Sequence, residues 1–452
     1  MNLNIRLDEY CESVRDGTHD TPKPTPEGFH LVTSKAIKNN KIDFDSCYFI
    51  SEEDYIKINK RSKVDKWDVL MTMIGTVGRL LLVKDNPNYA IKNIALFKVN
   101  DEYKAKWLYY YLSTKNVQDY FEMIASGTSQ HFIGLGHLRK LKINDYHAGS
   151  KQIVDILSVY DNLIENNNKR IKLLEQMAEN LYKEWFVRFR FPGYENAEFE
   201  NGLPKGWEYV KFDDILSFDR GISYSSEEID CEDGLNLINL KNIDAFGGFR
   251  RDGTKKYNGK YKESQVVKKG DLVIGVTDMT QDRRTVGAAA LIPTIKGTSV
   301  ISADLVKVVS DIPNIYLYCL CRYGFYSKYF SQFANGANVL HLKPGALLNK
   351  KVLLPTKDLI EAFVEKASAI IELIDELNLA NDNLIKQRDL LLPRLMSGKL
   401  KVGKTTENIH KAKVISFEQF VSNMGMAARA KSISNSDLIA MYEAYIDDDA
   451  TE

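Results

Sequence analysis

Two long heptad patterns constrain the fold of this chain more than any other feature. Apolar residues recur at alternating steps of four and three over 153–185, and Asn167 is the one polar position of that seam. A second seam of the same kind covers 363–395 and contains Asn381 and Arg388. Because each α-helical residue adds 1.5 Å, a helix over 150–188, the segment that contains the first seam, would be roughly 58 Å long. The sequence therefore predicts two long helices.

The polar positions of the two seams predict how the helices pair. If the seams pack antiparallel with Ile153 opposite Leu395, equal steps along both helices place Asn167 opposite Asn381. A buried asparagine pair fixes the register and orientation of two helices at some cost in stability. We therefore predict Asn167 and Asn381 as a register pair. The alternative is that both side chains lie on solvent-wetted parts of imperfect seams.

The spacing of the seams extends into an internal repeat. The offset from Ile153 to Phe363 is 210 residues, and a similar offset relates Ala-Ser-Gly-Thr at 125–128 to Ala-Asn-Gly-Ala at 334–337. Aromatic-rich helical stretches precede both tetrapeptides. We predict an α+β fold in which two tandem mixed α/β domains are separated by two long antiparallel coiled-coil helices. The expected segments are a domain at 1–147, a helix at 148–195, a domain at 196–355, a helix at 356–400 and a tail at 401–452.

Composition narrows the class of protein. Lys and Arg together number 61, as do Asp and Glu, so the formal net charge is zero, and 44% of the residues are hydrophobic. Such a composition excludes wholesale disorder and a small, strongly basic DNA-binding module, but it leaves room for local basic surfaces. The chain has no apolar run long enough for a membrane span and no cysteine spacing typical of a disulfide framework. We expect a soluble, intracellular protein.

Turn-rich segments with hydrogen-bonding side chains recur in both predicted domains. Lys and Arg can position phosphates, and Asn, Gln, Arg and His can read base edges. Ordinary polar loops, or the solvated face of a β-hairpin, are the alternative. The candidate DNA contacts of the first domain are Thr18, His19, Lys35, Asn39, Lys41, Arg79, Thr128, Ser129, Gln130 and His131. Those of the second domain are Lys241, Asn242, Arg250, Arg251, Lys255, Arg283, Arg284, Asn338, His341 and Lys343.

Several motifs resemble the DNA-specificity subunits of type I restriction–modification systems over about residues 1–400. The motifs are Leu-Tyr-Lys-Glu-Trp-Phe-Val-Arg-Phe-Arg-Phe-Pro-Gly at 181–193, Leu-Pro-Lys-Gly-Trp at 203–207, Leu-Leu-Pro-Arg-Leu-Met-Ser-Gly-Lys-Leu at 391–400 and Asp-Gly-Thr-His at 16–19. The second domain departs from the pattern, because 335–341 reads Asn-Gly-Ala-Asn-Val-Leu-His where the first domain has Ser-Gly-Thr-Ser-Gln. The recognition loop of that domain cannot be assigned residue by residue.

The resemblance implies a non-catalytic subunit that reads DNA for a larger complex. Each domain would read one half of a split, asymmetric double-stranded site, and the helices would set the spacer and dock two modification subunits. S-adenosylmethionine, ATP and Mg would bind to the methyltransferase and restriction/translocase subunits, and this chain would carry no cofactor or metal of its own. The family implies the cytoplasm of a bacterium or archaeon, with no membrane partner.

Catalytic motifs give little support for an enzyme. Residues 398–405 match Gly-x-x-x-x-Gly-Lys-Thr, but a phosphate loop needs a strand before it and a helix after it, whereas a long helix precedes this segment. The spacing of Cys319 and Cys321 is too short for a zinc finger, so both are expected as core thiols. The tail has a helical pattern near 434–446. A self-contained nuclease or NTPase and a coiled-coil protein adaptor remain as alternatives.

Overall fold

The computed structural model describes residues 4–38, 40–125, 131–147, 149–229, 233–279, 282–336 and 339–400. These residues form two compact units. The first unit contains the described residues up to Glu165 and those from Asn383 onward, and the second contains Asn166–Asp382. Both boundaries fall within long helices, so each unit combines one mixed domain with one part of each helix.

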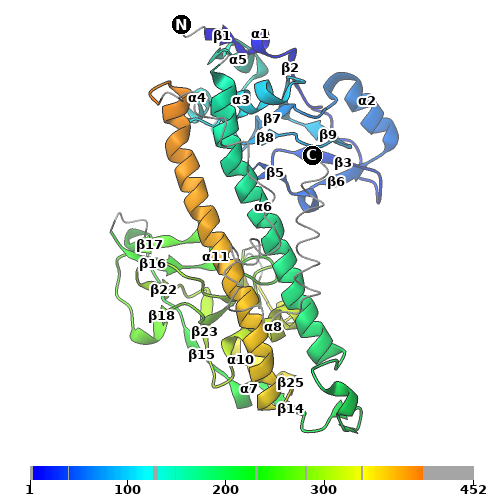
Figure 1. Cartoon of the computed structure of the whole chain (residues 1–452), viewed down its shortest axis with the longest axis vertical. Helices are drawn as coiled ribbons and strands as arrows, with labels where there is room; N and C mark the ends of the chain where they lie inside the picture. The colour runs from blue at the N-terminus through cyan, green and yellow to red at the C-terminus, as the bar shows by residue number, and fades with distance from the viewer. Residues whose placement is uncertain are drawn as a thin grey trace. The chain divides into compact units, whose positions relative to one another are not determined.

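The two long helices are α6 (Ser150–Tyr182), which ends in a π-helical turn over Lys183–Val187, and α11 (Lys357–Met396). They lie side by side in Figure 1. In the second unit the rings of Trp185 and Phe363 are 5.8 Å apart, and Asn167 Nδ2 donates a hydrogen bond of 2.9 Å to Asn381 Oδ1. Both contacts join residues at equal steps along seams that run in opposite directions. The predicted antiparallel pair of long helices is confirmed.

The described residues of the first domain form two larger sheets, two strand pairs and five short α-helices. Its central sheet is antiparallel in the order β2 (Ser13–Asp16), β10 (Ile94–Lys98), β7 (Val69–Thr72) and β8 (Leu80–Leu82). A second sheet has the order β6 (Tyr48–Ile50), β3 (Phe29–Thr33) and β9 (Tyr89–Lys92), with β3 and β9 parallel. The remaining pairs are β4 (Ile37–Lys38) with β5 (Lys41–Ile42) and β1 (Asn4–Arg6) with β11 (Lys142–Asn144). The helices are α1 (Leu7–Tyr10), α2 (Glu52–Ser62), α3 (Glu102–Leu112), α4 (Lys115–Ile124) and α5 (Leu135–Lys140).

The central sheet is buried on both faces because alternate residues of a strand point to opposite sides. Val69 and Met71 pack into a core with α3 and α4, whereas Leu70, between them, packs against the second sheet. The same alternation separates Phe97 from Leu96 on β10. The domain is therefore a helix layer, a central sheet and a second sheet.

The second unit repeats this construction. Its central sheet has the order β15 (Ser217–Arg220), β23 (Leu305–Val309), β19 (Leu272–Gly275) and β21 (Ala289–Leu291), and its second sheet has the order β17 (Lys255–Tyr257), β16 (Leu235–Ile238), β22 (Ser299–Ile301) and β18 (Val266–Val267). The smaller pairs are β20 (Thr277–Asp278) with β24 (Leu340–His341), β14 (Glu208–Lys211) with β25 (Lys351–Leu354), and β12 (Phe199–Glu200) with β13 (Leu203–Pro204). The helices are α7 (Phe212–Ile215), α8 (Asn314–Tyr323), α9 (Tyr326–Ser331) and α10 (Pro344–Leu348).

Strand order and pairing are therefore the same in both central sheets, and a parallel pair lies inside both second sheets. The predicted α+β fold with an internal repeat is confirmed. Each aromatic stretch forms two helices, because Ser113 and Thr114 separate α3 from α4, and Gly324 and Phe325 separate α8 from α9. Short 3-10 turns cover Phe44–Ser46, Tyr194–Asn196, Ser226–Glu228, Leu240–Asn242, Arg251–Gly253 and Glu263–Gln265.

Candidate nucleic-acid interface

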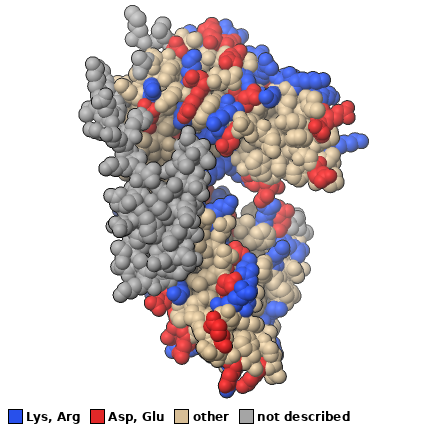
Figure 2. All heavy atoms as spheres, turned by 45° about the vertical axis from the view of Figure 1, so that its right-hand side comes forward, with Lys and Arg blue, Asp and Glu red and all other residues tan. Residues whose placement is uncertain are grey.

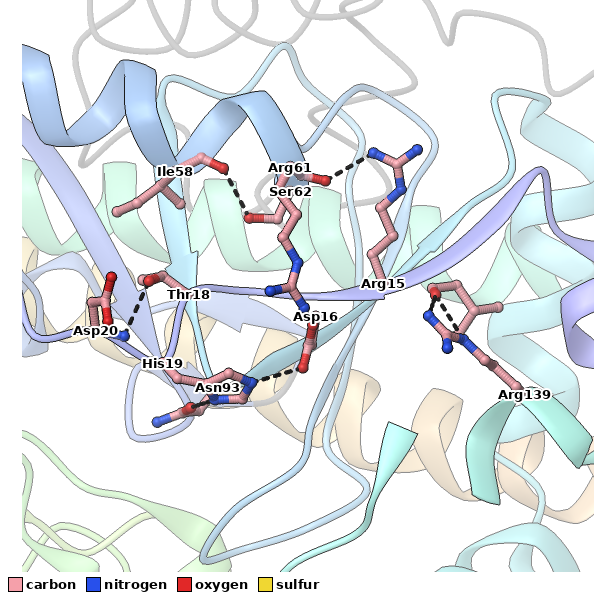
Figure 3. Close-up of polar contacts among 11 residues, drawn as sticks. Arg15, Asp16, Thr18, His19, Asp20, Ile58, Arg61, Ser62, Asn93 and Arg139 are labelled. Atoms are coloured by element: carbon pink, nitrogen blue, oxygen red, sulfur yellow. Dashed lines mark hydrogen bonds and ion pairs between the residues drawn. The ribbon is translucent and has the colours of Figure 1, made fainter. Parts of the chain in front are cut away.

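A polar cluster surrounds the turn that follows strand β2 in the first domain (Figure 3). Asp16 is only 5% exposed, and its Oδ2 lies 2.9 Å from Nε2 of His19, while Oδ1 accepts a hydrogen bond from Arg61 of α2. The other ring nitrogen of His19 lies 2.8 Å from Oδ1 of Asn93. A buried carboxylate is costly without such partners. Both nitrogens of the His19 ring are thus held, while 57% of its side chain stays exposed.

Gly17 fixes the path of this turn. A Cβ at this position would lie 2.3 Å from the carbonyl oxygen of Ile91, so no larger residue fits without movement of the backbone. The neighbouring Thr18 donates its N–H to the same carbonyl at 3.0 Å, and its Oγ1 accepts from the N–H of Asp20 at 3.1 Å. Thr18 therefore shapes the turn that presents His19.

Two further candidates of the first domain, Lys35 and Arg79, lie at the turn and hairpin that follow Ser34, a residue bonded to Asn93. Ser34 donates its hydroxyl to the carbonyl oxygen of Asn93 at 3.3 Å, and Lys35 follows it in an exposed turn. Arg79 is exposed and donates from Nη1 to the carbonyl of Ile37 at 3.2 Å, which anchors it to the hairpin just after that turn. The structure therefore brings candidates that are distant in sequence to one region of the domain.

Lys41 and His131 belong to the same region. Lys41 is exposed on β5 of the hairpin, and His131 is exposed beside the turn that begins at Gly75, whose N–H donates to the carbonyl of His131 at 2.9 Å. Four candidates of this domain lie outside the described residues: Asn39, Thr128, Ser129 and Gln130.

In the second domain, a corresponding edge forms where β20 pairs with β24. His341 is exposed opposite Thr277, and Lys343 is exposed two residues later. Arg283 has φ = 54° and donates to the carbonyl of Gln332 at 3.3 Å, and Arg284 keeps 46% of its side chain exposed. Asn338 lies outside the described residues.

The remaining candidates of the second domain divide into exposed and structural residues. Lys241 is exposed, and Lys255 is half-buried on β17. Arg250 is half-exposed, and the hydrogen bond that it donates to Asp252 at 2.9 Å raises the pKa of its guanidinium, which therefore stays charged. Asn242 is fully buried and donates two hydrogen bonds of 2.9 Å, to Arg250 O and Thr254 Oγ1. Asn242 therefore supports the loop and leaves the candidate set.

Arg251 also has a structural position. Its guanidinium donates to the carbonyl of Thr294 at 3.0 Å and forms an ion pair with Asp375 of helix α11, so its side chain is only 19% exposed. The Thr294 N–H and hydroxyl donate to the same carboxylate at 3.0 and 2.7 Å. Arg251 thus joins the second domain to the helix and leaves the candidate set.

Sequence reasoning missed Asp16, Arg61 and Asn93. Asp16 begins the Asp-Gly-Thr-His motif that contains the predicted Thr18 and His19, so the motif itself could have indicated it. Arg61 and Asn93 are distant in sequence and meet the motif only through the packing of α2 and the β9–β10 corner. No pattern in the chain marks either of them.

The charge of the visible surface is mixed. Figure 2 shows Lys and Arg interspersed with Asp and Glu over the described parts of that face. This agrees with the zero formal net charge. Candidate contacts are therefore discrete side chains at strand ends.

Groups that could support catalysis are scarce among the described residues. No three His, Cys, Asp or Glu side chains in that part of the chain are grouped so that they could hold a metal ion. Cys319 and Cys321 are buried on α8, and burial raises the pKa of the Cys321 thiol to about 12. Of the 398–405 motif, only the first three residues are described, and the tail at 401–452 is outside the described range. None of the described helices has the length and apolarity that a membrane crossing requires.

Comparisons with known proteins identify the family. Residues 4–176 match the family model of the type I restriction modification DNA specificity domain. The MjaIX type I restriction enzyme specificity subunit of Methanocaldococcus jannaschii is 26% identical over 75% of this chain and 78% of its own length. The HindI specificity subunit of Haemophilus influenzae is 24% identical over 82% and 94% of the two chains. The chain thus matches this specificity domain over 4–176, and the two relatives named here, which match three quarters or more of its length, are type I specificity subunits.

The fold agrees with these matches to type I specificity subunits. The crystal structure of a type I specificity subunit from M. genitalium aligns with a TM-score of 0.50 over 87% of this chain and 95% of that one, at 16% identity. As a specificity subunit, the protein recognises the DNA target sequence and is the non-catalytic component of its restriction–modification system.

Proposed function

We propose that this specificity subunit reads a bipartite, asymmetric double-stranded DNA site, with one half-site for each mixed domain. The observation that carries the proposal is the repeated placement of candidate side chains at equivalent strand ends. In the first domain His131 lies beside the Gly75 turn, and in the second His341 lies opposite Thr277. Both sets lie on a common arrangement of strands, but they differ in side chains, as two different half-sites require.

The proposed contacts of the first half-site include Thr18, His19, Lys35, Lys41, Arg79 and His131, with Asn39, Thr128, Ser129 and Gln130 from outside the described residues. Those of the second are Lys241, Arg250, Lys255, Arg283, Arg284, His341 and Lys343, together with Asn338. The expected domain limits remain 1–147 and 196–355.

The paired helices are proposed to set the spacer between the half-sites. A helix of 40 residues such as α11 is about 60 Å long, which exceeds the DNA helical turn of about 34–36 Å. We propose that this pair also docks two modification subunits, and that restriction/translocase subunits join the same complex. S-adenosylmethionine, ATP and Mg would bind to those partners, in the cytoplasm of a bacterial or archaeal cell.

Methylome sequencing tests the proposal. A host that expresses the chain with its modification subunits should acquire adenine methylation at one split motif. His131→Ala should relax the first half of that motif only, and Arg284→Ala the second half only. Lys142→Ala and Lys351→Ala are matched controls, because these exposed lysines occupy corresponding strands, β11 and β25, away from the proposed edges.

Two results would contradict the proposal. The first is an unsplit motif, or no motif that depends on this chain. The second is a uniform loss across both halves in the His131 and Arg284 variants, which would indicate a folding defect rather than a local contact. DNA cleavage or ATP hydrolysis by the chain alone would instead favour a self-contained enzyme, and assembly with partners that ignores DNA would favour an adaptor.

A further inference from the structure

One buried carboxylate orients two exposed side chains in the first domain. The side chain of Asp16 is 8% exposed, and its two oxygens are divided between Arg61 and His19. The side chain of Arg61 is 64% exposed, although its guanidinium is held by this contact. An exposed arginine normally samples many rotamers, so a fixed one is an unusual feature of a surface.

The helix that carries Arg61 is itself held in place. Helix α2 begins at the N-cap Ser51, which accepts from the N–H of Asp54 at 3.2 Å, and it buries Ile58 in a small core with the second sheet. At the other end, Arg15 of β2 donates to the carbonyl of Arg61 at 2.8 Å. Arg61 is thus held at its backbone carbonyl by Arg15 and at its guanidinium by Asp16, and Figure 3 shows these residues side by side.

We propose that Arg61 reads a guanine in the first half-site and that Asp16 is its positioning residue. The guanidinium meets Asp16 through one N–H of Nη2. The second N–H of Nη2, together with Nη1 or Nε, leaves one bidentate edge that can face the O6 and N7 acceptors of guanine. This inference rests on the proposed function, because it takes the His19 turn as part of the DNA-contacting edge. Preorganisation by Asp16 lowers the entropy cost of holding the arginine in this geometry.

The second domain does not repeat the arrangement. By strand register, Asp16 lies opposite Ala95 and Arg220 lies opposite Val306 at the equivalent point, so an exposed arginine occupies the position of the buried carboxylate. Among the described residues of that domain, no helix corresponds to α2. The inference therefore concerns the first half-site alone.

The test uses the full chain in complex with its modification subunits and a DNA library randomised in both half-sites. Arg61→Lys keeps a positive charge for Asp16 but removes the planar pair of donors. We expect its preference for one guanine of the first half-site to fall by about 5- to 150-fold, the range of a bidentate arginine–guanine contact. Asp16→Asn should weaken the same preference, and the second half-site should be read as in the wild type.

Lys60→Ala is the matched control, since Lys60 is exposed on the same helical turn, whereas the two oxygens of Asp16 contact Arg61 and His19. It should leave the base preference unchanged. If Arg61→Lys destabilises the fold, the double variant Arg61→Gln/Asp16→Asn removes both charges together and should show the same loss of guanine preference.

Three outcomes would overturn the inference. The first is a first half-site without a guanine. The second is that Arg61→Lys leaves every base preference unchanged, which would make the ion pair purely structural. The third is that Arg61→Lys weakens binding to all sequences equally and lowers the salt dependence, which would indicate a phosphate contact. Failure of the proposed function is distinguishable, because the wild-type complex would then show no split motif.

Discussion

The two mixed domains have the same strand arrangement but carry different exposed side chains on it. Both have the same central strand order, and in both a glycine at the end of the first central strand passes against a backbone carbonyl. Around that glycine, the first domain has the Asp16 cluster and helix α2, whereas the second has Arg220 and no corresponding helix among its described residues. The comparison teaches that buried strands fix where a recognition turn lies, and that the exposed side chains are free to change.

Attachment to the long helices also differs between the units. In the first unit, Tyr110 and Arg388 donate to the two oxygens of Asp161 at 2.6 and 2.7 Å, and an exposed pair joins Lys84 to Glu165. In the second unit, the buried Asp375 of α11 accepts from Thr294 and pairs with Arg251. The second domain also contacts α6 through Arg322 and Glu175, but its pair of Arg251 and Asp375, with side chains 19% and 9% exposed, is more buried than either ion pair of the first unit.

The largest expected effect comes from removing the carboxylate of Asp375. Asp375→Ala removes the buried carboxylate that Arg251 and Thr294 share and leaves Arg251 with the half-exposed Asp382 at 3.6 Å. It should lower the free energy of unfolding by up to about 3–5 kcal/mol, measured by urea denaturation. Lys357→Ala is the control, because Lys357 is 87% exposed at the start of the same helix. A loss below about 1 kcal/mol for Asp375→Ala would remove the contrast between the two units.

Substitutions at the two equivalent glycines, Gly17 and Gly221, test whether both domains depend on the same close approach of strands. A Cβ would lie 2.3 Å from the carbonyl oxygen of Ile91 at Gly17 and 2.0 Å from that of Ser302 at Gly221. Gly17→Ala and Gly221→Ala should therefore each cost about 1–3 kcal/mol in thermal unfolding, as overpacking does.

Gly136→Ala and Gly345→Ala provide the matched controls for these variants. Both glycines lie in corresponding short helices, α5 and α10, and an added Cβ would meet nothing within 4 Å. Equal destabilisation by the control substitutions would show that the close approach at Gly17 and Gly221 is not the cause.

The asparagine pair should give a smaller, non-additive effect. Asn167→Leu leaves the buried amide of Asn381 without its 2.9 Å partner and should cost about 1–2 kcal/mol. The double variant Asn167→Leu/Asn381→Leu should recover that loss but weaken the selection of one register. Urea unfolding gives the first quantity, and cross-linking between cysteines placed on facing helix positions gives the second. Unchanged pairing in the double variant would contradict a role in register.

The smallest effect is expected at Lys84. Lys84→Ala removes an ion pair whose side chains are 31% and 40% exposed, so it should lower the free energy of unfolding by less than about 1 kcal/mol, and less still at high salt. Urea unfolding at two salt concentrations measures both. A loss as large as that of Asp375→Ala would mean that the two units are attached to the helices with similar strength.

The sequence predicted the long helices, the repeat and the helix orientation, because these follow from periodicity and equal spacing. The seam from 153 to 185 matches α6 and its final turn closely. The family resemblance was carried by motifs at the ends of the two long helices and at strands β2 and β13.

The site was only partly predictable, because the sequence gives the residue types in a loop but not the groups that they contact. Asn242 and Arg251 were predicted as DNA contacts from their types, yet the first is bonded inside a loop and the second is paired with Asp375. Arg61 was missed because it reaches Asp16 only after α2 packs on the second sheet. Long-range contacts of this kind leave no local pattern.

The first unit combines segments that lie far apart in the chain, and this has a consequence for its synthesis. Strand β11 closes its domain at Asn144, but Leu392 and Leu395, which cover Trp107 and Leu157, come roughly 250 residues later. At about 5–20 residues per second, the ribosome needs on the order of 12–50 seconds to supply them. During that interval the nascent chain carries an uncovered apolar helix face, so binding by a chaperone at this stage would protect it from aggregation.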